Sequence, residues 1–145
     1  MDPSSIEQNI RCDANGSYGD LVIAIDIDNT ITATKQSKRF FRALTNEMID
    51  KAKIILISNR NPDAASVRKT ASEMKKLGIV YHDIVHTANK AEVIEFQRVN
   101  VFFEDTDEYF LDVPKNVLVL KPRENGNFDF NAKKWIYGDK TGRKV

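Results

Sequence analysis

Short aliphatic runs alternate with segments of helical periodicity along most of the chain. The runs cover Leu21–Ile27, Ile54–Ile57, Val101–Phe103 and Val117–Leu120, with a weaker one at Ile79–Val85. A nearly continuous aliphatic run is typical of a strand that is buried on both faces of a parallel sheet. The sequence therefore predicts four buried strands and a fifth, weaker one.

The segments between the runs carry apolar residues at spacings of three and four positions, which favours amphipathic helices. These segments are Phe40–Ile49, Ala64–Met74 and a stretch from about Asn89 toward Val99. The second has the clearest boundaries, since Asn61, Pro62 and Asp63 are start signals and Gly78 is a stop signal.

Alternation of strand and helix predicts βαβ units with right-handed crossovers. The expected fold is α/β, a Rossmann-like three-layer sandwich with a central parallel sheet. Residues 1–20 lack sustained periodicity and are expected to form an N-terminal arm, followed by a single domain over residues 21–145. Ligands of such sheets bind beyond the carboxyl ends of the strands, so the polar residues after each run are the functional candidates.

Two carboxylates, Asp26 and Asp28, follow the first run and precede Asn29 and Thr30. An aspartate at a strand end can attack phosphorus, while a second carboxyl protonates the leaving oxygen and later activates water. Carboxylates this close repel each other unless a cation lies between them, which predicts Mg²⁺ bound by oxygen ligands. The alternative is an ordinary turn, because Asp and Asn are common turn formers.

Ser58 and Asn59 follow the second run, where a hydroxyl and a backbone N–H suit the non-transferred oxygens of a phosphoryl group. Alternatively, either side chain caps the next helix. Lys90 is expected in the first turn of the third helix, where a cation is unfavourable unless an anion lies in front of it. The alternative for Lys90 is a solvated surface position.

Four acids follow the run Val101–Phe103 within five residues: Glu104, Asp105, Asp107 and Glu108. Directly after an apolar strand, they form a candidate metal pocket. The alternative is a helix N-terminus, where the helix dipole favours acids. Which of the four binds a metal stays open.

In this order, Asp26-Ile-Asp28-Asn-Thr30, Ser58, Lys90 and Glu104-Asp105 resemble the four motifs of the haloacid dehalogenase (HAD) superfamily of phosphatases. The resemblance covers about Leu21–Leu120, and its most specific part is the apolar strand that ends in DxDxT. It implies that Asp26 is the nucleophile that forms an aspartyl-phosphate. It also implies that Asp28 is the general acid and base.

The same resemblance implies that Ser58 and Lys90 bind the phosphoryl group, and Thr30 and Asn59 are further phosphate-binding candidates. The Mg²⁺ ligands would be Asp26, the backbone carbonyl of Asp28, and Asp105. Glu104 stands where Asp or Gly is often found and is a further candidate ligand.

The connections between the motifs are short. Residues 31–57 and 59–89 each have room for one helix, and the second also holds a strand, so neither holds a cap domain. The resemblance thus implies the capless type, whose open site admits a bulky or polymeric substrate or is closed by a neighbouring subunit in a homo-oligomer.

The C-terminal segment mixes aromatic and basic residues, which could stack bases and neutralise phosphates. They are Phe128, Phe130, Trp135, Tyr137, Lys133, Lys134, Lys140, Arg143 and Lys144. A nucleotide or a nucleic-acid terminal phosphate is therefore the leading substrate class. The alternative is that the aromatic rings dock on the core and the cations stay solvated.

Two other functions remain open at this stage. One is a phosphatase for a sugar phosphate, a lipid phosphate or a phosphoprotein. The other is a nucleic-acid-binding module with little turnover on the same fold.

Composition mainly excludes certain kinds of partner and site. The 22 Lys and Arg balance 21 Asp and Glu at a formal charge of +1, so charge nominates no partner. The lone Cys12 cannot form an internal disulfide, no Cys and His spacing suggests zinc, and a cytoplasmic setting is expected. No apolar run approaches the roughly 20 residues that span a bilayer. His82 and His86 are expected to be structural or exposed.

Overall fold

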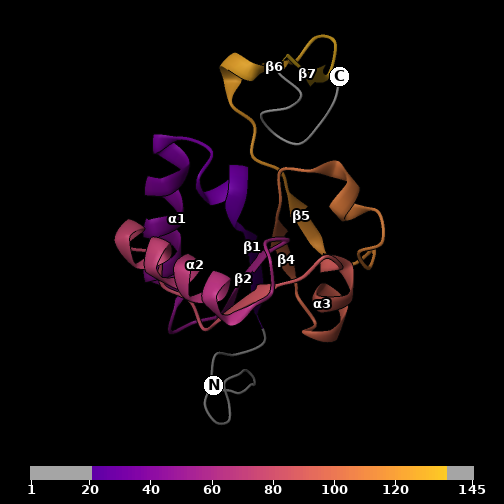
Figure 1. Cartoon of the computed structure of the whole chain (residues 1–145). Helices are drawn as coiled ribbons and strands as arrows, with labels where there is room; N and C mark the ends of the chain where they lie inside the picture. Colours follow the sequence, from indigo (N-terminus) through magenta and orange to yellow (C-terminus); the bar gives the residue numbers. More distant parts are fainter. Residues whose placement is uncertain (1–20, 137–145) are drawn as a thin grey trace.

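The computed structural model describes residues 21–136, so the predicted N-terminal arm and Cys12 lie outside the described residues. The five strands of the main sheet are β1 (Val22–Asp26), β2 (Lys53–Ser58), β3 (Asp83–His86), β4 (Val101–Phe103) and β5 (Leu118–Leu120). Their order in space is β3-β2-β1-β4-β5, and all of these pairings are parallel. Figure 1 labels four of these strands, β1, β2, β4 and β5, between the helices. The predicted α/β, Rossmann-like sandwich is confirmed.

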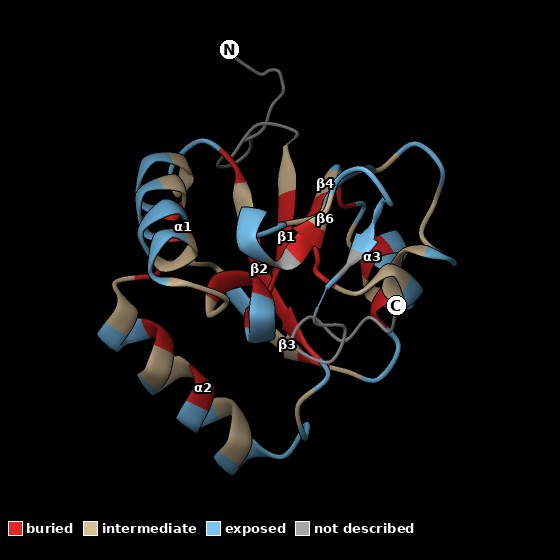
Figure 2. Ribbon diagram, turned by 90° about the horizontal axis from the view of Figure 1, so that it is seen from above, coloured by how far each residue is buried: buried red, intermediate tan, exposed pale blue. Residues whose placement is uncertain are grey.

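Helices cover both faces of this sheet. Helices α1 (Lys35–Met48) and α2 (Ala64–Leu77) lie on one side of the buried strands, and α3 (Lys90–Phe96) lies on the other (Figure 2). A short helical turn, η2 (Asp107–Phe110), packs on the same face as α3. Each connection from β1 to β3 holds a single helix, so the described chain has no separate cap domain.

The core explains the continuous aliphatic runs. In β2, Ile54 and Leu56 pack under α1 and α2, whereas Ile55 and Ile57 pack under α3 and η2. Successive side chains of a strand point to opposite faces, and here both faces are covered. A strand in this position must be apolar at every residue.

The helix boundaries follow local capping. Thr34 and Ser37 form a capping box at the start of α1. Asp63 caps α2 by accepting the backbone N–H of Ser66, and Gly78 ends α2 with a positive φ of 75°. A Cβ on Gly78 would lie 2.9 Å from Cδ of Arg42, so glycine suits this position for both backbone and space. The predicted start and stop signals of α2 are confirmed.

Two predicted strand limits are wrong, and so is the burial predicted for the last strand, because Leu118, Val119 and Leu120 of β5 are all exposed. The weak strand predicted at Ile79–Val85 begins only at Asp83 and extends to His86. Ile79 instead donates its N–H to the carbonyl of Met74 and packs in the core, because an apolar residue after the terminal glycine secures the helix end. Ile27 begins a turn, η1 (Ile27–Ile31), instead of ending β1.

The chain continues beyond the end of β5 into a hairpin of β6 (Phe128–Asp129) and β7 (Lys134–Trp135) (Figure 1). Phe128 is buried and contacts the ring of Phe130 at 4.9 Å, while Phe130 itself is exposed. Phe128 belongs to neither of the two core clusters around the main sheet, so docking of these rings on the core stays a prediction. Tyr137, Lys140, Arg143 and Lys144 lie outside the described residues. Within residues 21–136, no helix has the length and apolar character needed to cross a membrane.

Candidate active site

The sheet topology gathers the predicted site residues at one edge. Strand β1 lies between β2 and β4, and the connections leave this point toward opposite faces of the sheet. Asp26 is the last residue of β1, Ser58 is the last of β2, and Glu104 directly follows β4. Parallel strands end at the same edge, so these side chains meet at the switch point where α/β folds bind ligands.

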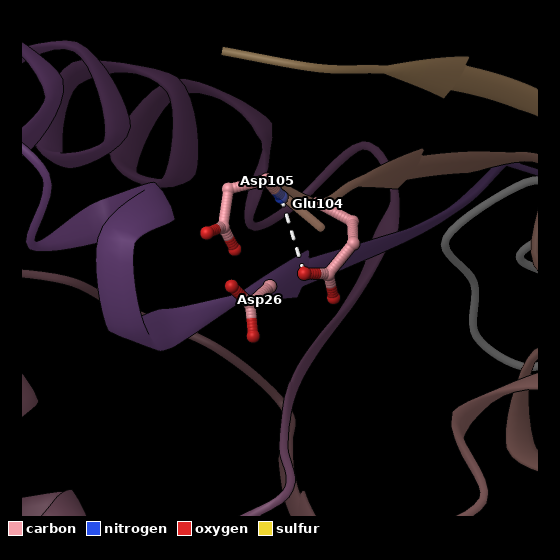
Figure 3. Close-up of side chains that lie close together, drawn as sticks. All are labelled: Asp26, Glu104 and Asp105. Carbon is pink, nitrogen blue, oxygen red and sulfur yellow. Dashed lines mark hydrogen bonds between the residues drawn. The ribbon is translucent and has the colours of Figure 1, made fainter. Parts of the chain in front are cut away.

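Three buried carboxylates form a cluster at this edge: Asp26, Glu104 and Asp105. One oxygen of each lies within 4.8 Å of the others, and the side chains project from the ends of β1 and β4 toward a common centre (Figure 3). Hard cations prefer such oxygen ligands, so the cluster is suited to holding a metal ion. Asp107 and Glu108 lie in the first turn of η2 and are not members of the cluster, as the helix-terminus alternative predicts.

Lys90 lies between two of these carboxylates and is only 2% exposed. Its Nζ is 2.6 Å from Oδ1 of Asp26 and 2.7 Å from Oε1 of Glu104, and it lies 4.2 Å from the centre of the Tyr109 ring. Burial alone would lower the pKa of Lys90, but attraction to the two carboxylates outweighs it and raises the pKa. The surface alternative for Lys90 is wrong.

Glu104 is held at both oxygens. Oε1 accepts from Lys90, and Oε2 accepts the backbone N–H groups of Asp105 and Thr106, each at 3.1 Å. Burial, followed by repulsion from Asp26, raises the pKa of Glu104. These contacts make Glu104 a positioning residue, which fixes both Lys90 and the turn that presents Asp105.

The carboxyl group of Asp105 has a strongly raised pKa. Burial, together with hydrogen bonding to Glu104 and Asp26, raises its pKa to about 9. Three carboxylates face one lysine here, so full ionisation leaves a net charge of −2 in a buried space. An opposite charge lowers the pKa of a carboxyl group. A divalent cation bound between these carboxylates would therefore offset their negative charge.

The turn η1 brings Thr30 back to the nucleophile candidate. Asn29 has a φ of 62°, and this left-handed residue lets the chain reverse after β1. The Thr30 hydroxyl then lies 2.8 Å from Oδ2 of Asp26 and 3.4 Å from Oδ1 of Asp105. Asp26 is thus fixed at both oxygens, by Thr30 and by Lys90.

Asp28 does not join the cluster. Its carboxylate is half-exposed and bound by Arg60 through two hydrogen bonds, of 2.7 and 2.9 Å. The bonds from Arg60 lower the pKa of Asp28. Two carboxylates two positions apart in sequence therefore occupy different environments. Arg60 was not predicted as a site residue, although its position two residues after Ser58 places it at the same edge.

Ser58 and Asn59 lie at the end of β2 without capping α2, since Asp63 does this. Ser58 is buried and its hydroxyl accepts the backbone N–H of Arg60 at 3.1 Å. Asn59 donates from Nδ2 to the Tyr109 hydroxyl at 2.7 Å, which links β2 to η2. The capping alternative for both residues is wrong.

His86 lies at the same edge of the sheet and is buried, in agreement with the structural position expected for it. It pairs with Ser58 in the register of β2 and β3, at the carboxyl end of the sheet. Its Nδ1 lies 2.6 Å from the carbonyl of Asn61, while Nε2 is buried and has no hydrogen-bond partner among residues 21–136.

No known family model matches this chain, and no curated protein matches it either. The site must therefore be interpreted by its own chemistry. A carboxylate fixed at both oxygens, a buried acidic cluster, a buried lysine and a half-exposed second carboxylate are groups that can carry out phosphoryl transfer.

Proposed function

We propose that this chain is a Mg²⁺-dependent phosphomonoester hydrolase of the capless HAD type, working through an aspartyl-phosphate on Asp26. The observation that carries the proposal is the immobilised carboxylate of Asp26, which lies beside Asp105 in a buried acidic cluster. A nucleophile must be held in one orientation while the positive charge needed for a phosphoryl group lies next to it.

The donor chemistry of the cluster supports Mg²⁺, a hard cation that binds carboxylate oxygens. Asp26 and Asp105 are the proposed side-chain ligands, and the backbone carbonyl of Asp28 is the further ligand that the HAD resemblance implies. Glu104, the third carboxylate of the cluster, accepts hydrogen bonds from Lys90 and two backbone N–H groups and is a further candidate ligand. When bound, Mg²⁺ would neutralise charge on the phosphoryl oxygens.

In the first proposed step, an oxygen of Asp26 bonds to phosphorus while the bond between phosphorus and the ester oxygen breaks. Asp28 gives its proton to the leaving oxygen, and Lys90 and Ser58 stabilise the negative charge of the other phosphoryl oxygens. Thr30 keeps Asp26 in line for the attack. The alcohol then leaves with the proton from Asp28.

In the second step, Asp28 takes a proton from water as the water oxygen bonds to phosphorus. The bond between Asp26 and phosphorus breaks, which releases inorganic phosphate and restores both carboxyl groups. A nucleotide or a nucleic-acid end is the leading substrate class, because the site opens without a cap and aromatic and basic residues follow β5.

The test is phosphate release from an aryl phosphate with Mg²⁺ and with a chelator, comparing the wild type with Asp26→Asn. We expect Mg²⁺-dependent release and a loss of at least about a thousandfold in the variant, whose circular dichroism stays unchanged. Asp50→Asn, an exposed acid just beyond α1, is the matched control and should keep full activity. Near-normal release by Asp26→Asn would contradict the nucleophile assignment.

A further inference from the structure

A groove of about 800 Å³ lies beside the acidic cluster. It runs between the start of α1 and the ends of β4 and β5, and its lining includes Asn29, Thr34, Phe40, Phe103, Leu120 and Arg123. None of the three clustered carboxylates lines it, yet Asn29 directly follows Asp28 and Phe103 directly precedes Glu104. The groove therefore opens at the same edge of the sheet as the cluster, with the size of a small-molecule site.

One wall of this groove is aromatic and rigidly backed. The centroid of the Phe40 ring lies 5.0 Å from that of Phe41 and 6.4 Å from that of Phe103, and the centroids of Phe41 and Phe103 are 5.2 Å apart. All three pairs meet edge to face. Phe41 is buried, whereas Phe40 is 53% exposed. A ring fixed from behind and open in front offers a planar ligand a stacking surface at little entropic cost.

The rim of the groove is basic. Lys35, Lys121 and Arg123 line it against one acid, Glu124. Lys121 also pairs with Asp107, and the guanidinium of Arg123 lies 4.3 Å above the Phe128 ring. These cations complement an anionic ligand, in contrast to the acidic cluster next to them.

We infer that this groove binds the leaving group of the substrate, and that this group carries a planar aromatic ring, as a nucleoside monophosphate does. The inference rests on the proposed function, which places the phosphoryl group at Asp26. The organic part of the ester then extends past Asn29 and stacks on Phe40. A phosphorylated alkyl chain fits less well, because stacking rewards a flat ring and not a chain.

The test compares kcat/KM for a nucleoside 5′-monophosphate with kcat/KM for glycerol phosphate. Because an aromatic side chain stacks on the flat face of any base, Phe40→Ala should lower this ratio about tenfold, and Phe40→Trp should retain it. The matched control is Phe96→Ala, a residue that is 82% exposed on α3, and it should leave the ratio unchanged. An unchanged ratio in Phe40→Ala, or an equal loss for an alkyl phosphate of similar length, overturns the inference.

Calorimetric binding of the same nucleotide separates this inference from the proposed function. In the Asp26→Asn background, adding Phe40→Ala should weaken binding about tenfold. If the wild type hydrolyses no ester while Phe40→Ala still weakens nucleotide binding, the phosphatase proposal fails and the groove assignment stands. If turnover is normal and neither the kinetic ratio nor the binding responds to Phe40→Ala, the groove assignment fails alone.

Discussion

Arg60 binds both carboxylate oxygens of Asp28, with Nη2 2.7 Å from Oδ1 and Nε 2.9 Å from Oδ2. The same guanidinium donates from Nη1 to Thr70 and Glu73 on α2, at 2.9 Å each. Asp28 is thereby tied to α2 and held in its ionised form. A general acid must be protonated, so the proposed chemistry requires Asp28 to leave Arg60 when substrate enters.

Replacing Arg60 by Gln should raise the pKa of Asp28 from its lowered value toward or above the ordinary 3.8, because the hydrogen bonds that favour the carboxylate are lost. A carbon-detected NMR titration of the aspartate carboxyl groups measures this directly. The sign also fixes an effect on stability. A lowered pKa contributes stability above pH 3.8 that is lost as pH falls through the folded-state value, and Arg60→Gln should remove this contribution.

Asp63 is the internal control for that titration. Its pKa is also lowered, but by the backbone N–H of Ser66 at the start of α2. It should not respond to Arg60→Gln. An unchanged Asp28 pKa in the variant would show that Arg60 does not hold the carboxylate in solution.

The raised pKa of Asp105 predicts how the free energy of unfolding changes with pH when a chelator keeps the cluster free of metal. Its pKa is raised from 3.8 to about 9, so between these values the folded state binds a proton that the unfolded state lacks. Stability should therefore fall as pH rises through this window. Asp105→Asn should flatten the fall, and thermal unfolding monitored by circular dichroism at several pH values measures it.

Mg²⁺ should offset the fall in stability at higher pH, because it binds the ionised carboxylates of the cluster. At a concentration about 100 times its Kd, the ion stabilises the folded state by about 2.7 kcal/mol. Asp105→Asn should lose most of this gain. Glu108→Gln, which alters the same acidic run outside the cluster, should keep it. Equal loss in both variants would mean that the cluster is not the metal site.

His82 makes a second contribution to pH dependence. Its Nδ1 accepts the backbone N–H of Ile54 at 2.9 Å, and burial lowers its pKa below 6.5. The unfolded state therefore takes up a proton first, so this stability is complete above pH 6.5 and declines as pH falls below it. His82→Asn keeps an acceptor without titrating, and it should reduce the pH 5 to 7 change in unfolding free energy by less than about 1 kcal/mol.

Much of the fold follows from local pattern, and the contacts within the site do not. Strands β1 and β2 were predictable because burial on both faces demands continuous aliphatic residues, and α2 was predictable because Asp63 and Gly78 set its ends locally. The hydrogen bonds from Arg60 to Asp28 join residues 32 positions apart, and no spacing rule specifies them. Likewise, the position of Lys90 between two carboxylates depends on the strand order, not on its neighbours in sequence.

Asn29 is expected to be sensitive to backbone chemistry. Its φ of 62° is strained for most side chains, so Asn29→Ala should destabilise the fold by about 1 kcal/mol, and Asn29→Gly should change it little. Urea unfolding measures both. Arg98, with a φ of 56° after α3, is the comparison position remote from the cluster. There, Arg98→Gly should stabilise the protein by up to about 1 kcal/mol, since an unfavourable left-handed residue is relieved.

The separation of the cluster along the chain has a kinetic consequence. Lys90 reaches Asp26 across 64 positions, and Thr30 reaches Asp105 across 75. Because closing such long loops costs entropy, we expect these contacts to form late in folding, after β1 and β4 have paired. An ion held there has nothing to bind during the early search. We therefore expect that an ion bound there would slow unfolding and lengthen the lifetime of the native state, while leaving the rate of folding almost unchanged.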